Sequence, residues 1–245
     1  MALMISLNEI AQTLKSNQKY WIVFTGDSIT SCEWVHPNWR NILIYVLQTE
    51  TTKVLKGDWK TSEWGIKGFN FAYDGATTED ILNKMNDIVL VKPDLTIGLM
   101  GGNDPIFNIS VASHIGNIEK ITSELITAGS KVAWCTSIPP VGDEKRKLKY
   151  MPYAKACMQI SQSKNLQLVD LFNLYKKFPL EKFFTFKSEE NPEEGIKAGE
   201  QDIWHPNQLG NAYIAKVILK EVFSINFDPE KYIKETLAGE KYPSY

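Results

Sequence analysis

Three residues of this chain have the types that catalysis by a serine nucleophile requires, namely Ser28, His205 and Asp202. Ser28 lies in a Gly-Asp-Ser tripeptide directly after the apolar run of residues 21–24. A serine hydroxyl is a poor nucleophile at neutral pH, so it needs a base within hydrogen-bond reach and a third group that orients the base. Although the tripeptide alone is more typical of a simple turn, we interpret Ser28 as a nucleophile whose partners lie elsewhere in the chain.

The base and its orienting group are expected in one short turn near the C-terminus. Asp202 precedes His205 by three residues, which allows the carboxylate to accept from Nδ1 while Nε2 faces Ser28. The other two histidines have plainer interpretations, because His36 precedes a proline in a loop and His114 lies among helix residues. An Asp-x-x-His-Pro segment alone is more typical of an ordinary turn, so the triad hypothesis depends on both segments together.

Acyl transfer also needs hydrogen-bond donors that stabilise the developing oxyanion. Asn103 is the best side-chain candidate, since it follows two glycines at the end of the apolar run 95–100. Ligand sites in open α/β sheets lie at the carboxyl ends of the strands, so Asn103 is expected on the same edge as Ser28. A Gly-Gly-Asn-Asp segment is equally compatible with a turn asparagine in the left-handed conformation.

Strand and helix patterns alternate along the chain. Short apolar runs predict strands over residues 21–24, 66–73, 95–100, 131–136 and 166–171. Apolar residues at helical spacing predict helices over residues 7–14, 39–47, 78–89, 115–126, 153–163 and 209–219. This alternation is typical of a mostly parallel sheet with helices on both faces. We predict one α/β domain over residues 1–245.

Three connections are predicted as polar loops. Residues 50–65 contain several turn formers, and residues 143–149 are highly charged. Residues 187–200 are acidic and include Pro192 and Gly195, which predicts a surface loop. Whether this last loop closes over the site as a lid is left open.

The composition argues against several classes of partner. The chain has 27 Lys and Arg residues against 29 Asp and Glu residues, so no excess of positive charge favours nucleic acid or an anionic membrane. The first residues lack a signal-peptide pattern, and no stretch approaches the roughly 18 apolar residues of a membrane span. The three cysteines fit neither a disulfide framework nor a zinc site. These features predict a cytoplasmic protein and leave its oligomeric state open.

Four short motifs together resemble the SGNH hydrolases, the GDSL esterase/lipase superfamily. They are Gly-Asp-Ser at 26–28, Asn-Phe-Ala-Tyr-Asp-Gly at 70–75, Gly-Gly-Asn-Asp at 101–104 and Asp-Ile-Trp-His at 202–205. The motifs occur in the order of that superfamily and span most of the chain. Each is weak alone, whereas four in the same order are specific.

The resemblance implies a three-layer α/β/α sandwich with a five-stranded parallel sheet, and ester hydrolysis through an acyl-serine intermediate. It makes Ser28 the nucleophile, His205 the general base and later the general acid, and Asp202 the group that orients His205. It also implies an oxyanion hole formed by the backbone N–H groups of Ser28 and Ala72 and the side-chain amide of Asn103. The superfamily usually has glycine where this chain has Ala72, and alanine at positive φ would cost about 1–2 kcal/mol. No metal or organic cofactor is implied.

The motifs do not identify the substrate, which depends on the connecting loops. Aromatic residues that are able to stack on sugars or line an acyl groove are Trp34, Trp59, Trp64, Phe107 and Tyr150. Because the loops are mainly polar, we predict short acyl esters as substrates, such as O-acetyl groups on carbohydrate. The alternatives are a lysophospholipase or thioesterase, and a non-catalytic carbohydrate-binding relative of the fold. Transfer to an acceptor other than water is left open.

Overall fold

The computed structural model describes residues 4–139, 141, 144–190 and 197–237. Within these ranges five parallel strands form one sheet in the order β2-β1-β3-β4-β5. The strands are β1 (Tyr20–Thr25), β2 (Ile66–Asn70), β3 (Leu95–Met100), β4 (Lys131–Thr136) and β5 (Gln167–Val169). The central strands are almost entirely buried, as a parallel sheet with both faces covered requires.

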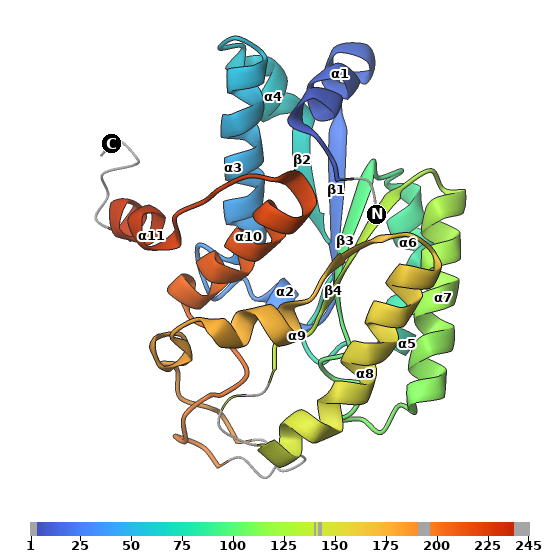
Figure 1. Cartoon of the computed structure of the whole chain (residues 1–245), viewed down its shortest axis with the longest axis vertical. Helices are drawn as coiled ribbons and strands as arrows, with labels where there is room; N and C mark the ends of the chain where they lie inside the picture. The colour runs from blue at the N-terminus through green and yellow to red at the C-terminus, as the bar shows by residue number, and fades with distance from the viewer. Residues whose placement is uncertain (1–3, 140, 142–143, 191–196, 238–245) are drawn as a thin grey trace.

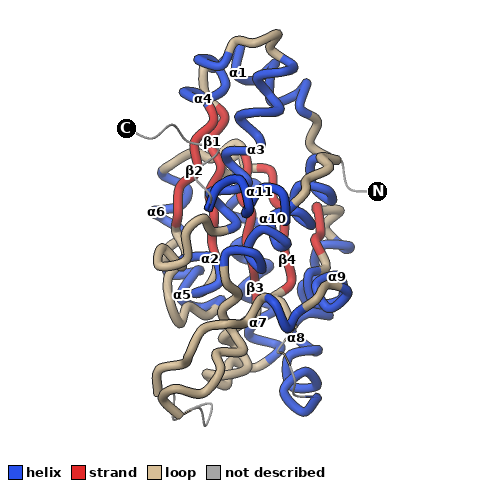
Figure 2. The backbone as a smooth tube through the Cα atoms, turned by 90° about the vertical axis from the view of Figure 1, so that its left-hand side faces the viewer, coloured by secondary structure: helices blue, strands red, loops and turns tan. Residues whose placement is uncertain are grey.

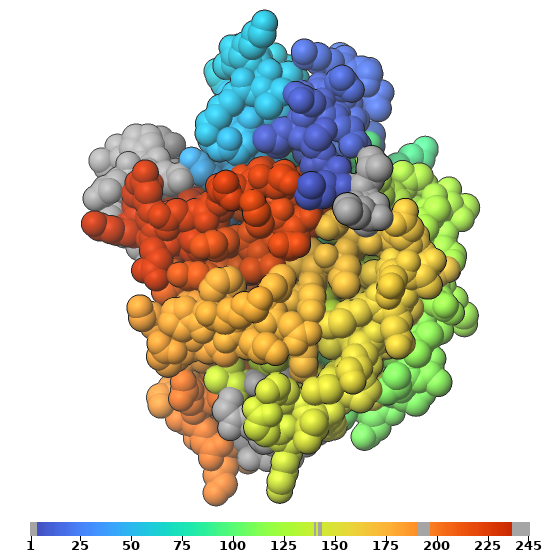
Figure 3. Space-filling model, in the orientation of Figure 1, coloured from blue at the N-terminus to red at the C-terminus, as the bar shows by residue number. Residues whose placement is uncertain are grey.

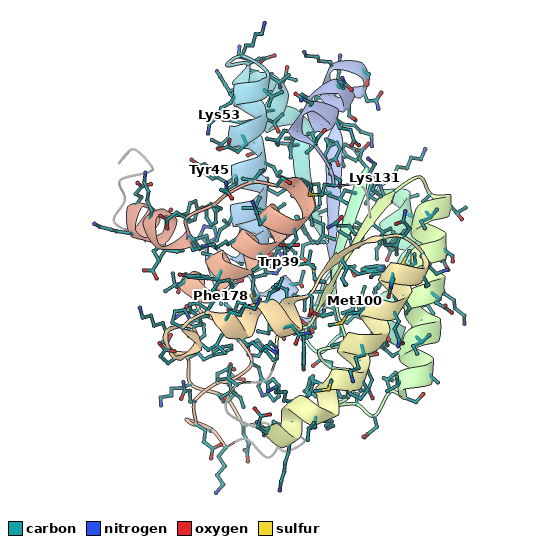
Figure 4. All side chains as sticks on the ribbon, in the orientation of Figure 1. Trp39, Tyr45, Lys53, Met100, Lys131 and Phe178 are labelled. Atoms are coloured by element: carbon teal, nitrogen blue, oxygen red, sulfur yellow. The ribbon has the colours of Figure 1, made fainter. Side chains whose placement is uncertain are left out.

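One face of the sheet is covered by helices from both ends of the chain. These are α1 (Leu7–Asn17), α3 (Trp39–Val54), α4 (Trp59–Gly65), α10 (Gln208–Phe223) and α11 (Pro229–Leu237). Figure 1 shows α3 and α11 to the left of the strands, with α10 beside them. The apolar residues of α1, α3, α10 and α11 share a core with Ile22 and Phe24 of β1. Trp39, in the first turn of α3, is fully buried there and packs edge-on against Phe24 (Figure 4).

The other face is covered by helices from the middle of the chain. These are α5 (Thr78–Asn83), α6 (Met85–Leu90), α7 (Val111–Thr127) and α8 (Glu144–Ser163). Their apolar residues form a second core with Val23, whose side chain points away from those of its neighbours in β1 because side chains alternate along a strand. Helices therefore lie on both faces of the sheet, and the predicted α/β/α sandwich is confirmed (Figure 1).

Short elements complete the fold at the ends of the strands. They are α2 (Ser28–Ser31), α9 (Leu171–Leu174), η1 (Tyr175–Lys177) and η2 (Leu180–Lys182). Figure 2 shows the strands running down the centre of the molecule, with long loops gathered at the lower end. Figure 4 labels Lys131 at the start of β4 and Met100 at the end of β3, and the lower position of Met100 shows that this end is the carboxyl edge.

Two predicted loops are largely helical. Within residues 50–65, α3 continues to Val54 and α4 begins after Asp58, whose carboxylate accepts from the Thr61 N–H at 3.2 Å. The stretch 143–149 was predicted as a loop because of its charge, but α8 already begins at Glu144, and Asp143 lies outside the described residues. Helix α8 also continues through Pro152. In these two stretches, charged residues and turn formers indicate exposure to solvent, and they do not exclude a helix.

Other boundaries also differ from the predictions. The strand predicted over 66–73 ends at Asn70, where the chain turns away from the sheet. The helix predicted over 78–89 is two helices, interrupted at Lys84. The apolar spacing continues across this interruption, because both helices bury residues in the same core: Ile81, Met85 and Ile88.

The strand order creates one switch point. From β1 the chain moves outward to β2 and then returns across β1 to β3, so the connections on the two sides of the β1–β3 pair run in opposite directions. In open α/β sheets, ligands bind outside the carboxyl ends of the strands at such a point. A ligand site is therefore expected among the residues that follow β1 and β3.

No helix within the described ranges combines the length and the apolar character that crossing a bilayer requires. The predicted cytoplasmic location and the single domain over 1–245 stay predictions.

A glycine in the central sheet makes room for a tryptophan. Gly98 of β3 pairs with Trp134 of β4, and a Cβ at Gly98 would overlap the indole ring. We predict that Gly98→Ala lowers the free energy of unfolding by about 1–3 kcal/mol through overpacking. Gly116→Ala is the matched control, because a Cβ there meets no atom within 4 Å and alanine favours the helix by up to about 1 kcal/mol.

Urea unfolding of both variants checks this prediction. A Gly98→Ala protein as stable as the wild type would show that the indole moves without cost. A destabilised Gly116→Ala protein would show that the control is unsuitable.

Candidate active site

A sharp turn after β1 fixes the position of Ser28. Gly26 has φ +145°, and a Cβ there would lie 2.7 Å from the Leu99 carbonyl oxygen, so the turn requires glycine. Asp27 caps the next turn of helix, since its carboxylate accepts from the Ile29 N–H at 3.0 Å. Ser28 is thus the first residue of α2, immediately beyond the carboxyl end of β1.

The buried side chain of Arg40 holds the other end of this turn. Its guanidinium donates to the carbonyl oxygens of Thr30, at 2.5 Å, and Ser31, at 3.1 Å. These carbonyl groups lie at the end of α2, where the helix itself supplies no further N–H donors. The same group pairs with Glu33 at 2.6 Å. The backbone around Ser28 is therefore anchored on both sides.

The structure brings Ser28, His205 and Asp202 into one hydrogen-bonded chain. The Ser28 hydroxyl donates to His205 Nε2 over 2.8 Å, and His205 Nδ1 donates to Asp202 Oδ2 over 2.7 Å. Asp202 Oδ1 also accepts from the backbone N–H groups of Trp204 and His205, at 2.7 and 2.9 Å. Because both carboxylate oxygens are engaged, Asp202 fixes the orientation and the tautomer of the imidazole.

The protonation of this chain depends on burial and on nearby carboxylates. Burial lowers the pKa of His205, but the hydrogen bond and the negative charge of Asp202 outweigh burial, so the pKa is raised above its ordinary 6.5. Burial acts against ionisation of Asp202 too, yet the hydrogen bond from His205 keeps the pKa of this carboxyl low. Burial raises the pKa of Asp27, which also lines the site, to about 6. The site therefore combines a carboxylate of low pKa with a base whose pKa is raised above its ordinary value.

The loop after β3 brings Asn103 to the same site. Its amide nitrogen donates to the Ala76 carbonyl oxygen at 3.1 Å, which leaves the second amide hydrogen for another acceptor. Asn103 and Ser28 both line one cleft of about 720 Å³ at the carboxyl edge of the sheet. In Figure 3 this lower end carries the segment after α9, in orange, and the beginning of α8, in yellow-green.

The structure does not bring the Ala72 N–H into the cleft. This group donates to Asn70 Oδ1 at 3.0 Å, and Ala72 is buried outside the cleft lining. Ala72 also has no positive φ, so the strain expected of an alanine there does not arise. The prediction that the Ala72 N–H faces the cleft was wrong, because the chain leaves the sheet after Asn70 and turns once more before it reaches the site.

Gly75 offers a backbone N–H at the cleft that the sequence did not predict as a donor. It lines the cleft, has φ +75°, and its N–H donates to no acceptor within the described residues. The Ser28 N–H likewise has no acceptor in the described part of the chain. The Asp-Gly pair in the second motif was the available signal, because such a pair marks a turn in which glycine takes positive φ.

A buried polar network connects the loops that carry Asn103 and Gly75. Asp104, which is 1% exposed, accepts from the backbone N–H of Thr78 at 3.1 Å and from its hydroxyl at 2.5 Å. The fully buried His114 pairs with the same carboxylate at 3.0 Å. These bonds join the loop after β3 to the start of α5 and to α7. His114 thus has a structural position, and the exposed His36 lies outside the cleft lining.

The aromatic residues predicted to contact a substrate divide into two groups. Trp34, Phe107 and Tyr150 line the cleft, whereas Trp59 and Trp64 pack against each other on α4. Phe186 and Trp204 also line the cleft and were not predicted. No set of three His, Cys, Asp or Glu side chains within the described ranges is arranged to hold a metal ion.

This chain is similar to known esterases both in sequence and in structure. One relative is the GDSL esterase/lipase CPRD49 of Arabidopsis thaliana, which is 24% identical over 180 residues. The alignment covers 64% of this chain and 66% of that protein, which is just under two thirds of its length. A variant of the acetyl xylan esterase Axe2 from Geobacillus stearothermophilus superposes with a TM-score of 0.65 at 17% identity, over 86% of this chain and all of the other. The acetyl xylan esterase AlAXEase gives a TM-score of 0.63 at 19% identity, over 83% of this chain and all of the other.

The family comparison covers most of the chain. The model of the GDSL-like lipase/acylhydrolase family matches residues 22–218, a range that extends from β1 into α10 and includes all four motifs. The matched range includes the turn of Ser28 after β1 and the turn that carries Asp202 and His205. The chain belongs to the GDSL-like lipase/acylhydrolase family.

Proposed function

We propose that this chain is a serine esterase that hydrolyses short acyl esters, with acetyl esters of carbohydrate as the preferred class. The observation that carries the proposal is the continuous hydrogen-bonded chain from Ser28 through His205 to Asp202, which opens onto the cleft. Membership of a lipase/acylhydrolase family supports the same reaction class. The non-catalytic alternative gives no reason for this geometry.

The proposed reaction has two steps. In the first, His205 Nε2 takes the proton of the Ser28 hydroxyl while Oγ attacks the ester carbonyl carbon, and the imidazolium then gives this proton to the leaving alkoxide. In the second, His205 deprotonates a water that attacks the acyl-serine, and the proton returns to Ser28 Oγ as the carboxylic acid leaves. Asp202 stabilises the imidazolium in both steps.

The oxyanion is assigned to donors that face the cleft. We assign the N–H groups of Ser28 and Gly75 and the free amide hydrogen of Asn103, since all three residues line the cleft and these hydrogens have no acceptor in the described structure. Gly75 replaces Ala72 in this role. Preorganised donors of this kind lower the barrier because they need no rearrangement when charge develops.

Short acyl groups are favoured by one apolar part of the cleft lining. Ile106, Tyr150 and Trp204 line the cleft and also pack together in one apolar cluster. The rings of Tyr150 and Trp204 are stacked with centroids 5.7 Å apart. Because these side chains pack against one another, the wall that they form limits the length of the acyl chain that fits against it. The acetyl xylan esterases with the same fold have substrates of this type.

The charges around the cleft argue against the two enzyme alternatives. Asp74 and Glu189 line it in addition to the carboxylates of the site, and Lys187 is the one lysine or arginine of the described lining. A coenzyme A thioester or a lysophospholipid brings phosphate groups, which these carboxylates repel. A neutral ester meets no such repulsion.

Turnover of nitrophenyl esters from acetyl to long acyl chains tests the proposal. We expect the wild type to prefer acetyl and Ser28→Ala to lose nearly all turnover. Ser16→Ala, in the exposed last turn of α1, is the matched control and keeps wild-type activity. Equal turnover in Ser28→Ala would exclude the serine mechanism, and an optimum at long chains would exclude the acetyl preference.

Asn103→Ala tests the oxyanion assignment. The variant is expected to lose about 10²–10³ in kcat, because the missing donor acts on charge that appears only in the transition state. Asn226→Ala, at an exposed position far along the chain, serves as the control. A change confined to KM would assign Asn103 to substrate binding instead.

The pH profile tests the electrostatic coupling between Asp27 and His205. His205 must be neutral to accept the Ser28 proton, so kcat/KM falls as pH decreases through the raised pKa of His205. Asp27→Asn removes a negative charge that favours the imidazolium, while its side-chain oxygen still accepts from Ile29. We predict that the midpoint of the acid limb moves to lower pH.

The control for this profile is Asp87→Asn, at an exposed position on α6 outside the cleft lining, for which the midpoint is expected to stay in place. An unchanged midpoint in Asp27→Asn would contradict the coupling.

A further inference from the structure

Trp34 is an exposed side chain on a firmly held loop. The indole is 54% exposed, although its neighbour Val35 is fully buried. On the other side, Glu33 is paired with Arg40 at 2.6 Å and accepts from the Asn70 amide at 3.3 Å. The backbone on both sides of the indole is therefore anchored, and the exposure of Trp34 is a fixed feature of the fold.

The ring of Trp34 stands directly beside the general base. Its centroid lies 5.4 Å from that of His205 and 5.3 Å from that of Phe186, and both neighbours are nearly perpendicular to it. All three residues line the cleft. These contacts occupy only part of the indole surface, and the remainder faces solvent at the site.

The proposed reaction determines which half of the ester meets this ring. His205 Nε2 gives its proton to the oxygen of the leaving alcohol, so that oxygen must come within about 3 Å of Nε2. The carbonyl oxygen instead faces Gly75 and Asn103. The group attached to the leaving oxygen therefore lies next to the His205 ring, whose centroid is 5.4 Å from that of Trp34.

The polar groups of the cleft that Trp34 lines fit an uncharged polyhydroxylated alcohol. The Asp74 carboxylate lines the cleft and is held by a hydrogen bond from the Ser31 hydroxyl. Carboxylates accept hydrogen bonds from sugar hydroxyls and repel an anionic alcohol. An aromatic face beside such acceptors suits a ring with an apolar C–H face and a hydroxyl edge.

We propose that Trp34 is the platform on which the alcohol half of the ester stacks, and that this half is a neutral pyranoside ring. The inference rests on the proposed esterase function for its orientation of the substrate. It assigns to Trp34 the discrimination between a sugar ester and an ester of a small acyclic alcohol.

Kinetics with two acetyl esters test the platform. The substrates are a mono-O-acetylated methyl xylopyranoside and ethyl acetate, which share the acyl group and differ only in the alcohol. In Trp34→Ala the ratio of kcat/KM for the xyloside to kcat/KM for ethyl acetate is expected to fall about tenfold, with Trp34→Phe between this variant and the wild type. Trp64→Ala is the matched control, because this exposed tryptophan lies outside the cleft lining, and its ratio stays at the wild-type value.

Two kinetic outcomes would overturn the platform. An unchanged ratio in Trp34→Ala would show that the indole does not contact the sugar. An equal loss with both substrates would show that Trp34 only positions His205.

Binding without turnover separates this inference from the proposed function. In the Ser28→Ala background, the affinity for the acetylated xyloside is measured by titration calorimetry, and adding Trp34→Ala is expected to weaken it about tenfold, whereas adding Trp64→Ala is not. Equal affinity with and without Trp34 would overturn the platform even if the enzyme is an esterase. Binding that depends on Trp34, together with an absence of esterase activity in the wild type, would retain the platform and overturn the proposed reaction.

Discussion

The distance of 2.8 Å between Ser28 Oγ and His205 Nε2 is the constraint on which the rest of the site depends. It joins two segments separated by 177 residues. Neither segment holds its position alone, because one is a single helical turn after β1 and the other is a short turn before α10. A rigid sheet with helices on both faces supplies the common frame, and Asp202 removes the remaining rotational freedom of the imidazole. Catalytic geometry of this kind tolerates little displacement, since reacting atoms must meet at near van der Waals distance.

Buried polar groups give the loops of the site their rigidity. Asp104 is nearly inaccessible to water, and its carboxylate is compensated by donors from α5 and α7. The buried guanidinium of Arg40 is likewise matched to carbonyl oxygens and to Glu33. Such groups would be costly without their partners, so each network favours one arrangement of the loops over others. The network at Asp104 orders the loops of Asn103 and Gly75, and the network at Arg40 orders the turn of Ser28.

The cleft lining contains a packed apolar part and an exposed tryptophan, to which the proposals assign the two halves of an ester. The apolar part is formed by side chains that pack on one another, namely Ile106, Tyr150 and Trp204. Trp34 lies with its ring 5.4 Å from that of His205 and is 54% exposed. A closed apolar wall and an open aromatic surface with nearby carboxylates match a small acyl group and a larger polar alcohol. In the proposed function, the chain of Ser28, His205 and Asp202 acts on the ester bond, and the loops select the ester.

The sequence by itself determined the fold class and the residues of the hydrogen-bonded chain. Apolar runs alternating with helical spacing are typical of a parallel sheet. A parallel sheet places the residues after β1 and β3 on one edge, so Ser28 and Asn103 were predictable together. Only the tertiary structure showed which of the two residues, Ala72 or Gly75, presents its N–H group to the cleft. The direction of an N–H group depends on how the chain leaves the strand, and the Ala72 N–H donates to Asn70 Oδ1 instead. Only the structure separated Trp34 from Trp64, since both are tryptophans in polar connections and their positions relative to His205 depend on long-range packing.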